Sequence, residues 1–308
     1  MQSLIGIATI LLCVFGGFML HGGDLGVIWQ PVELVIIIGA GAGTIILGNP
    51  RHVLSEMWLQ VKQVLGRRKD GQEFQRQLLL LMYELLQTAA GGLKALDAHV
   101  EAPHESELFK RYPMILHEPK LLHFIVDNFR LMAMGKISAH ELEGVLEQEI
   151  ESIHEEMLQP ARSLGKVGDA MPGFGILAAV LGIVMAMQSV AKGADTGEVA
   201  VAVAAAMVGT FIGIFMCYGV LEPISNRMRQ LVDDERQALD SVKVVLVTHV
   251  AGKPPLLAID AGRRLVQLNT KPSFARLESW IDKLRNPEEV EEPATPRRRK
   301  GDLRAQQA

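Results

Sequence analysis

Cysteine is scarce in this 308-residue sequence, and its placement excludes a disulfide-bonded scaffold. The two cysteines, Cys13 and Cys217, both lie inside long apolar runs rather than at the spacings of a disulfide framework. We therefore expect both thiols to be packing residues. Cysteine usage consequently gives no information about the cellular compartment.

Signatures of catalysis are also missing. None of the nine histidines pairs with another histidine or with a cysteine at a metal-ligand spacing. There is no phosphate-binding P-loop, no G-x-S-x-G and no H-E-x-x-H. Acidic pairs such as Glu149 and Glu151 stand among many other charges, as on the solvated face of a helix. The sequence predicts no enzyme, no metal site and no cofactor.

What the chain does contain is a set of long apolar runs. It is 49% hydrophobic and 21% charged, with a net charge of -4, which is too apolar for an ordinary soluble domain and too charged for lipid alone. Crossing a bilayer takes about 20 apolar residues. The runs that approach or reach this length are 2–20, 27–47, 171–190 and 199–221.

Gln30, Pro31 and Glu33 stand near the start of the second run and leave only 34–47 as its clean apolar core. Inside such interfacial ends, the four runs contain no Asp, Glu, His, Lys or Arg. A charge at the bilayer centre costs at least about 3 kcal/mol and usually marks an ion path, so these spans offer no titratable group for an ion. They offer small residues instead, such as Gly209 and Gly213 in the fourth run and Gly175 and Ala179 in the third. Small faces let helices approach closely, either within one chain or from a partner.

Charged residues in the connections predict the orientation. Lysine and arginine residues flank the second, third and fourth runs on one side. The short loops 21–26 and 191–198 on the other side contain Lys192 as their only lysine or arginine. The positive-inside rule therefore places both termini and the long middle segment in the cytoplasm. The flanking cations are Arg51, Lys62, Arg67, Arg68, Lys69, Arg162, Lys166, Arg227 and Arg229.

The predicted fold is all-α: a polytopic membrane protein with four transmembrane helices and a helical cytoplasmic domain. Helical periodicity covers 73–90 and 119–135, a capping box at Ser138 begins a helix toward Leu158, and 224–250 continues directly from the fourth span. The predicted segments are a transmembrane hairpin at 1–48, a cytoplasmic insert at 49–168, a second hairpin at 169–223, cytoplasmic helices at 224–285 and a disordered tail at 286–308.

The tail joins an acidic block to the basic stretch RRRK, with prolines between them. The RRRK stretch could bind anionic lipid or nucleic acid, but the composition favours a solvated tail.

The third run contains a proline where a membrane helix is expected. Inside a helix, Pro172 removes one backbone hydrogen bond, at a cost of about 3 kcal/mol in water, and supplies a hinge with an exposed carbonyl. The alternative is a helix that starts here, because Pro172 lies only three residues after Asp169 and proline is well tolerated in a first turn.

Five blocks of the sequence resemble the MotA family, the ion-channel subunits of the bacterial flagellar stator. They are GDAMPGFGILAAVLGIV, AAAMVGTFIGIFMCYGVLEPIS, QPVELVIIIGAGAG, EAPHESELFKRYP and KPSFARLESW, which together extend the resemblance over about 1–286. The resemblance implies a multi-pass protein of the bacterial inner membrane. It also implies a homo-oligomeric ring around a dimer of single-span MotB-type helices, whose aspartate carries the ion.

The resemblance further implies an ion path along the third and fourth spans. Pro172 matches a proline beside that path, Thr210 a pore-facing threonine, and Pro223 a second functionally sensitive proline. Ala179 stands where sodium-driven relatives have a threonine, which favours protons. Lipids and the partner helix would surround these spans, and no nucleic acid is implied.

A contact with the rotor's switch-complex protein is implied for the insert. The acidic residue of that contact matches Asp97, for which a solvated helix charge is an equal alternative. The family's arginine falls on Ala89, and whether the nearby Lys94 replaces it stays open. This departure suggests a lateral or otherwise divergent flagellar system.

Two other functions are weighed against this one. Energisers of the ExbB or TolQ type drive outer-membrane processes and have three spans. This chain has four apolar runs and a MotA-like hairpin at Gln30 and Pro31, which favours the stator function. A membrane scaffold without ion flux is the second alternative.

Overall fold

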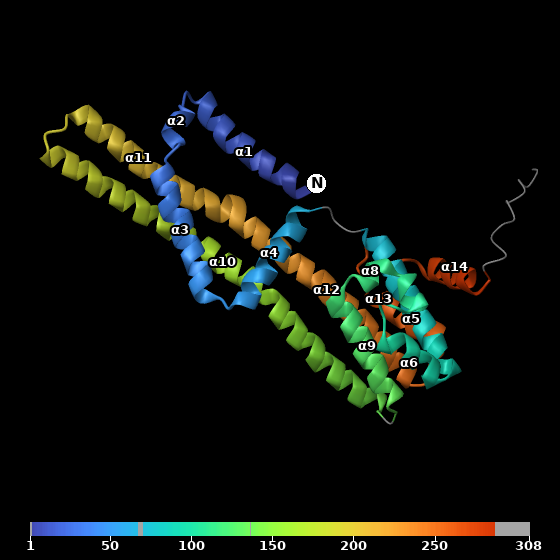
Figure 1. Cartoon of the computed structure of the whole chain (residues 1–308). Helices are drawn as coiled ribbons and strands as arrows, with labels where there is room; N and C mark the ends of the chain where they lie inside the picture. The colour runs from blue at the N-terminus through green and yellow to red at the C-terminus, as the bar shows by residue number, and fades with distance from the viewer. Residues whose placement is uncertain (1, 67–69, 136, 287–308) are drawn as a thin grey trace, which may run out of the picture. The chain divides into compact units, whose positions relative to one another are not determined.

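A computed structural model describes residues 2–66, 70–135 and 137–286, and every regular element in these ranges is a helix (Figure 1). Close contacts group the chain into two compact units. The first unit comprises residues 1–70 and 141–240, and the second comprises 71–140 and 241–308. The predicted tail beyond residue 286 lies outside the described residues.

The first unit contains the apolar helices and the charged helical segments that adjoin them, while residues 241–250 belong to the second unit. These helices are α1 (Gln2–Leu20), α2 (Leu25–Ile28), α3 (Pro31–Gly48), α4 (Arg51–Leu65), α10 (Ala139–Ala191), α11 (Thr196–Ile214), the π-helix η1 (Phe215–Leu221) and α12 (Glu222–Val250). Within the described ranges, three helical stretches are long and apolar enough to cross a membrane, namely Leu25–Gly48, Ala139–Ala191 and Thr196–Val250. The apolar stretch Ile5–Leu20 is shorter. The chain is thus an all-helical membrane protein, and a fourth span stays a prediction.

Two of the predicted runs differ in detail from the helices. The run 27–47 is not one helix, because α2 ends at Ile28 and α3 starts afresh at Pro31. Proline at the first helical position and Glu33 in the first turn both favour a helix start there. The capping-box helix predicted to begin near Ser138 runs on without interruption to Ala191.

Pro172 consequently lies in the interior of α10, and the alternative of a helix starting there is wrong. The segment boundaries at 168 and 223 also fall inside continuous helical stretches, whereas the compact units divide near 70, 140 and 240. A prolonged helix satisfies every interior backbone group without a loop at the membrane surface, apart from the carbonyls that face its prolines.

Polar side chains hold the helix ends of the first unit together. Ser163 donates a hydrogen bond of 2.6 Å to Asn49, which caps the end of α3. Buried Ser225 of α12 donates to the carbonyl of Ala161 at 2.8 Å, and buried Gln60 of α4 donates to that of Met157 at 3.0 Å. These bonds fix α3, α4 and α12 against α10.

The second unit is built around α5 (Gly71–Gly91), which is buried along most of its length. Its other helices are α6 (Leu93–Glu101), α7 (Glu107–Lys110), α8 (Pro113–Leu116), α9 (Pro119–Ala133), α13 (Pro255–Leu265) and α14 (Phe274–Arg285). The predicted helices at 73–90 and 119–135 correspond to α5 and α9.

One buried charge lies on α5. Glu84 accepts a hydrogen bond of 2.7 Å from Arg111, which neutralises it. Burial, reinforced by the Glu84 carboxylate, raises the pKa of Tyr112 well above its ordinary value. These three residues tie α5 to the segment between α7 and α8.

A second buried ion pair closes the C-terminal part of this unit. Asp260 and Arg263 side chains are 8% and 11% exposed and lie 2.6 Å apart, and Arg264 binds the other carboxylate oxygen at 2.9 Å. Arg263 also donates to the carbonyl of Pro272 at 2.9 Å. Burial alone would raise the pKa of Asp260, but the hydrogen bonds from both arginines outweigh it and hold the pKa below its ordinary value.

Replacement of Asp260 by alanine is expected to destabilise the protein by about 3 kcal/mol, because it leaves the Arg263 guanidinium buried without its partner. Asp282→Ala removes an exposed carboxylate from α14 and is expected to change stability little. Unfolding of the detergent-solubilised chain measures both. Equal stability of the two variants would contradict the assignment.

The same ion pair makes the stability of the protein depend on pH. Since the pKa of Asp260 is lowered in the folded state, the stabilisation that the ion pair gives the fold is present above about pH 4 and is lost as the pH falls through this lower pKa.

Candidate functional site

The hairpin of α10 and α11 brings two backbones into direct contact. The helices run antiparallel and are joined by a short loop, after which Asp195 caps α11 by accepting from the backbone N–H of Glu198 at 2.8 Å (Figure 1). A Cβ atom added to Gly175 would lie 2.7 Å from the carbonyl oxygen of Gly209. One added to Gly213 would lie 2.6 Å from the carbonyl oxygen of Met171. Only glycine fits at these two positions.

The spacing of Gly209 and Gly213 is therefore used for packing within the chain. The same crossing extends toward the loop, where an added Cβ on Gly182 would lie 2.7 Å from that of Ala206. By contrast, Gly173 has no heavy atom within 4 Å of its Cβ position. The glycines along this crossing are thus of two kinds: those packed against the chain's own helices, and Gly173, which no other described part of the chain covers.

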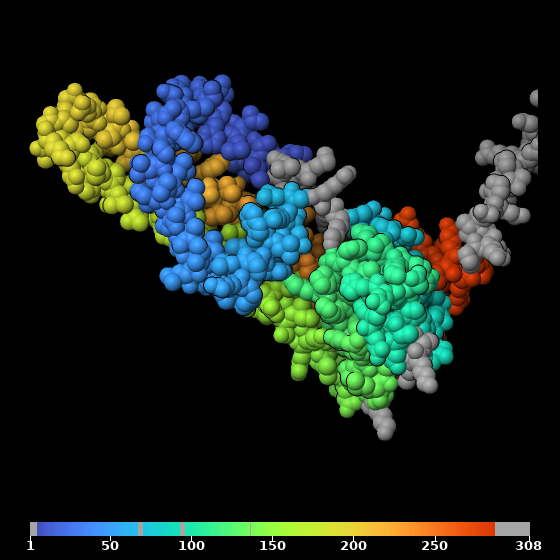
Figure 2. Space-filling view, in the orientation of Figure 1, coloured from blue at the N-terminus to red at the C-terminus, as the bar shows by residue number. Residues whose placement is uncertain are grey.

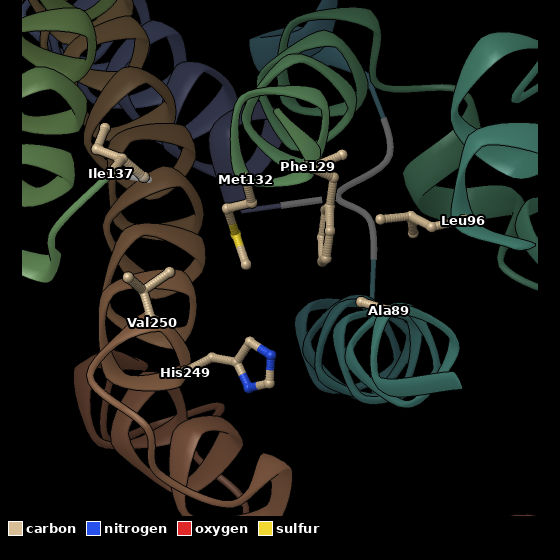
Figure 3. Close-up of a pocket in the computed structure, with 8 residues that line it drawn as sticks. Ala89, Leu96, Phe129, Met132, Ile137, His249 and Val250 are labelled. Atoms are coloured by element: carbon tan, nitrogen blue, oxygen red, sulfur yellow. The ribbon is translucent and has the colours of Figure 1, made fainter. Parts of the chain in front are cut away.

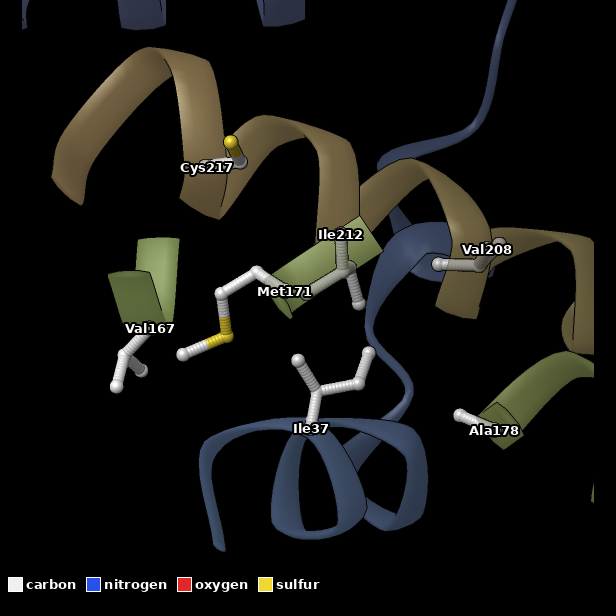
Figure 4. Packing of buried hydrophobic residues seen from close by; sticks show 7 residues of the cluster. All are labelled: Ile37, Val167, Met171, Ala178, Val208, Ile212 and Cys217. Carbon is white, nitrogen blue, oxygen red and sulfur yellow. The ribbon is translucent and has the colours of Figure 1, made fainter. Parts of the chain in front are cut away.

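Helix α3 lies across this hairpin. Figure 4 shows Ile37 of α3 pointing toward Met171 of α10 and Ile212 of α11, and all three are buried. Met171 also reaches over Gly41, so that α3 approaches closely at this point. The buried cluster consists of Ile37, Val167, Met171, Ala178, Val208, Ile212 and Cys217. The expectation that both cysteines are packing residues is confirmed for Cys217, whereas Cys13 of α1 is exposed within the chain.

Three of the predicted ion-path residues lie at this crossing. Pro172 and Ala179 are seven residues apart, so they share one face of α10 at a separation of about 10 Å. Between their levels, the Cα atom of Thr210 is 3.2 Å from the Cβ position of Gly175, and the backbone nitrogen of Ala179 is 3.4 Å from that of Gly209. All three residues are half-buried. Among the described residues, no hydrogen-bond partner is found for the Thr210 hydroxyl.

Pro172 does not interrupt α10, but it removes a donor from it. The carbonyl that would receive this bond belongs to Gly168, four residues earlier. Gly168 is buried against α12, since its Cβ position is 3.2 Å from the Cβ of Leu221 and 3.9 Å from the backbone nitrogen of Glu222. The turn that Pro172 weakens is therefore packed against the junction of η1 and α12.

Pro223 follows that junction directly and is exposed. The π-helix η1 precedes it, with the backbone N–H of Glu222 donating to the carbonyl of Cys217, five residues back. A π-turn is wider than an α-turn and accommodates a proline at its end. Pro223 is 13 residues beyond Thr210, about 20 Å along the helix, so it stands apart from the other three residues. Both prolines thus adjoin the contact between Gly168 and Leu221.

The π-helix and the Gly168 contact are not predicted from the sequence. The stretch FMCYGVL is apolar throughout, so its change of hydrogen-bond spacing leaves no periodic signal. The only hint in the sequence is Gly219. It lies four residues before Pro223, at the position whose carbonyl a proline ring would contact in an α-helix.

Charge is confined to the ends of the hairpin. Asp169 and Glu222 are both exposed at the end opposite the loop. In the described parts of the chain, no group of three His, Cys, Asp or Glu residues is arranged to hold a metal ion.

The outer face of the hairpin is apolar and uncovered by the chain. Large side chains along it are exposed by 42–71%. They include Ile176, Val180, Ile183, Val184, Met187, Val201 and Met207. Figure 2 shows the loop ends of α10 and α11 extending past α3. A continuous apolar face of this kind needs lipid or another helix against it.

The residues predicted to contact the rotor lie in the second unit. Asp97 is exposed on α6, and Lys94 belongs to the preceding turn of that helix. The side chain of Lys94 lies outside what the structure describes. Ala89 is half-buried near the end of α5.

Comparison with known families identifies two matching segments. Residues 4–92 match the Motility protein A N-terminal family, and residues 120–241 match the MotA/TolQ/ExbB proton channel family. The chain is 52% identical over 285 residues to Chemotaxis protein LafT of Vibrio parahaemolyticus, covering 91% of this chain and 98% of that protein. It is 38% identical over 290 residues to Motility protein A of Escherichia coli, covering 94% and 98%.

Two solved structures share the fold. One is C. jejuni MotAB, with a TM-score of 0.69 at 18% identity over 88% of this chain and 98% of that chain. The other is the flagellar MotAB stator complex of Bacillus subtilis, with a TM-score of 0.66 at 20% identity over 90% and 98%.

Gly213→Ala is expected to destabilise the α10–α11 hairpin by about 1–3 kcal/mol, because the new methyl group overlaps the Met171 carbonyl. The matched control is Gly43→Ala in α3, where the Cβ position has no atom within 4 Å. Thermal unfolding in detergent compares the two. A melting temperature unchanged in Gly213→Ala would show that the backbones do not touch.

Proposed function

Since the chain belongs to the MotA/TolQ/ExbB proton channel family and is a MotA-type stator subunit that forms a proton channel with MotB, we propose that its α10–α11 hairpin lines the ion path. The chain is a multi-pass membrane protein and not an enzyme. The observation that carries the proposal is the grouping of Pro172, Ala179 and Thr210 at one crossing of two apolar helices. The open Cβ position of Gly173 and the half-buried Thr210 lie there beside an uncovered apolar face.

The ion is carried on a carboxylate that the partner supplies. Because the apolar runs 171–190 and 199–221 of the hairpin contain no Asp, Glu, His, Lys or Arg, a proton that crosses along them needs an acid from another polypeptide. A single-span MotB-type helix with an intramembrane aspartate provides it. The open Cβ position of Gly173, next to Pro172, supports a close approach by such a helix.

Several copies of the chain surround the partner as a ring. The uncovered apolar residues of α10 and α11 support this arrangement, since lipid and neighbouring subunits bury what the single chain leaves exposed. In the ring, α1 forms a fourth span, and both termini and the second unit lie in the cytoplasm, in accord with the distribution of Lys and Arg.

Inward proton flow drives rotation of the ring about its axle. Protonation of the partner's carboxylate removes a charge facing the hairpin and changes which packing is favoured. Each proton that crosses supplies about 2.3 kcal/mol per 100 mV of membrane potential. The Gly168 carbonyl, which lacks its helical donor, and the adjoining junction with η1 form the deformable point of α10.

The second unit transmits the motion to the rotor's switch-complex protein. Its candidate contacts are Asp97, which is exposed, and Lys94, both on α6. The small side chain of Ala89 in place of the family's arginine favours service in a lateral or otherwise divergent flagellar system.

Pro172→Ala is expected to abolish swimming while the protein still inserts in the membrane, because α10 regains a backbone hydrogen bond and loses its deformable turn. Motility in soft agar and membrane fractionation measure the two effects. Pro160→Ala restores a bond in the same helix but outside the apolar run, and is expected to retain swimming. Torque that persists in Pro172→Ala would overturn the proposed role of this turn.

Proton specificity gives a separate test. With Ala179 at the position where sodium-driven relatives have a threonine, we expect swimming to continue in sodium-free medium. It should stop when a protonophore collapses the proton gradient. Swimming speed that rises and falls with external sodium would contradict this assignment.

A further inference from the structure

The second unit contains a cavity that the ion path does not use. It has a volume of about 250 Å³ and is enclosed by the ends of α5, α6, α9 and α12 (Figure 3). Leu96 and Phe129, almost fully buried, form its floor. The remaining walls are half-buried, so the cavity opens to the surface. They are Ala89, Met132, Ala133, Ile137, His249 and Val250.

His249 is the polar group of this cavity. Figure 3 shows its imidazole pointing into the space between Met132 and Ala89. Its Nδ1 atom is buried, and no hydrogen-bond partner is found for it among the described residues. Burial lowers the pKa of His249 and favours the neutral ring, although a backbone hydrogen bond with Lys253 opposes this. A buried ring nitrogen without a partner is costly unless an incoming group satisfies it.

Resting on the proposed contact between α6 and the rotor, we propose that this cavity receives an aromatic side chain with a polar tip, tyrosine or tryptophan, from the rotor's switch-complex protein. The apolar ring fills the space above Phe129 and Leu96, and its O–H or N–H donates to Nδ1 of His249. The contact thus has an apolar anchor in addition to the charge of Asp97.

The size and lining of the cavity fit this occupant. An apolar cavity of about 150 Å³ holds one benzene, so 250 Å³ is large enough for a phenol ring and for the larger indole ring. Tyrosine and tryptophan combine a large apolar body with one donor, which matches seven apolar walls and one imidazole. Such side chains, seated in a pocket, supply most of the energy of many protein interfaces.

The helices around the cavity offer further contacts to a protein partner. Asp97 and Glu101 are four residues apart and both exposed, so α6, which supplies Leu96 to the cavity, also carries two carboxylates on one face. Met134, beside the wall residues of α9, is 81% exposed. A partner segment that carries a lysine or arginine as well as its aromatic residue would therefore complement both α6 and the cavity.

Ala89→Leu fills the cavity from α5, and Ala133→Leu fills it from α9. In the complex with the MotB-type partner, each is expected to weaken binding to the purified switch-complex protein at least about tenfold and to reduce swimming in proportion. Ala90→Leu adds the same volume at the exposed neighbouring residue and should bind as the unmodified chain does. His249→Leu keeps the walls apolar but removes the acceptor, with an expected loss of several-fold.

Proton uptake by the assembled complex separates this inference from the proposed function. It is expected to stay unchanged in all four variants, because the cavity lies outside the spans. Rotor binding by Ala89→Leu and Ala133→Leu equal to that of Ala90→Leu would overturn the inference and leave the channel untouched. Loss of proton uptake in Ala89→Leu would also overturn it.

Discussion

The contact of backbone on backbone between α10 and α11 is the constraint on which the rest of the membrane-embedded structure depends. Gly175 and Gly213 bring the two helices so close that a single methyl group has no room. In lipid there is little hydrophobic gain from joining two apolar helices, so close packing has to hold them. The position of α3 follows, because Ile37 and Gly41 fit the surface that this crossing creates.

This constraint also divides the surface of α10 by function. The face that carries Gly175 is occupied within the chain, whereas Gly173 and the apolar residues beyond it are free for other helices. The apolar runs of this hairpin, 171–190 and 199–221, contain no Asp, Glu, His, Lys or Arg of their own. A rigid, uncharged wall with one open side suits a subunit that positions a proton carried by another protein.

Much of this organisation was predictable from the sequence, and the exceptions have physical reasons. The uninterrupted apolar run gave the bounds of α1, and the periodicity of 73–90 and 119–135 indicated α5 and α9. Asp169 and Pro172 resemble a helix start locally, yet packing on both sides keeps α10 continuous. The second run divides at Gln30 because a proline at the first position of α3 favours a new helix.

The candidate sites were harder to predict, because they join residues far apart in the chain. The resemblance named Pro172, Ala179 and Thr210, but only the structure shows that the glycines between them place all three at one crossing. The π-helix before Pro223 leaves no trace in a uniformly apolar stretch. Likewise, nothing in the sequence connects Ala89 with His249, which meet across a cavity.

The 53-residue length of α10 has a consequence for how this protein can evolve. At 1.5 Å per residue, the helix is about 80 Å long, and no loop interrupts it to absorb a change in length. Deleting one residue between Leu142 and Pro172 would turn everything beyond it by about 100°. Insertions and deletions are therefore tolerable here only in whole helical turns. The direction in which the side chains after Pro172 point is set by the number of residues that precede them in α10.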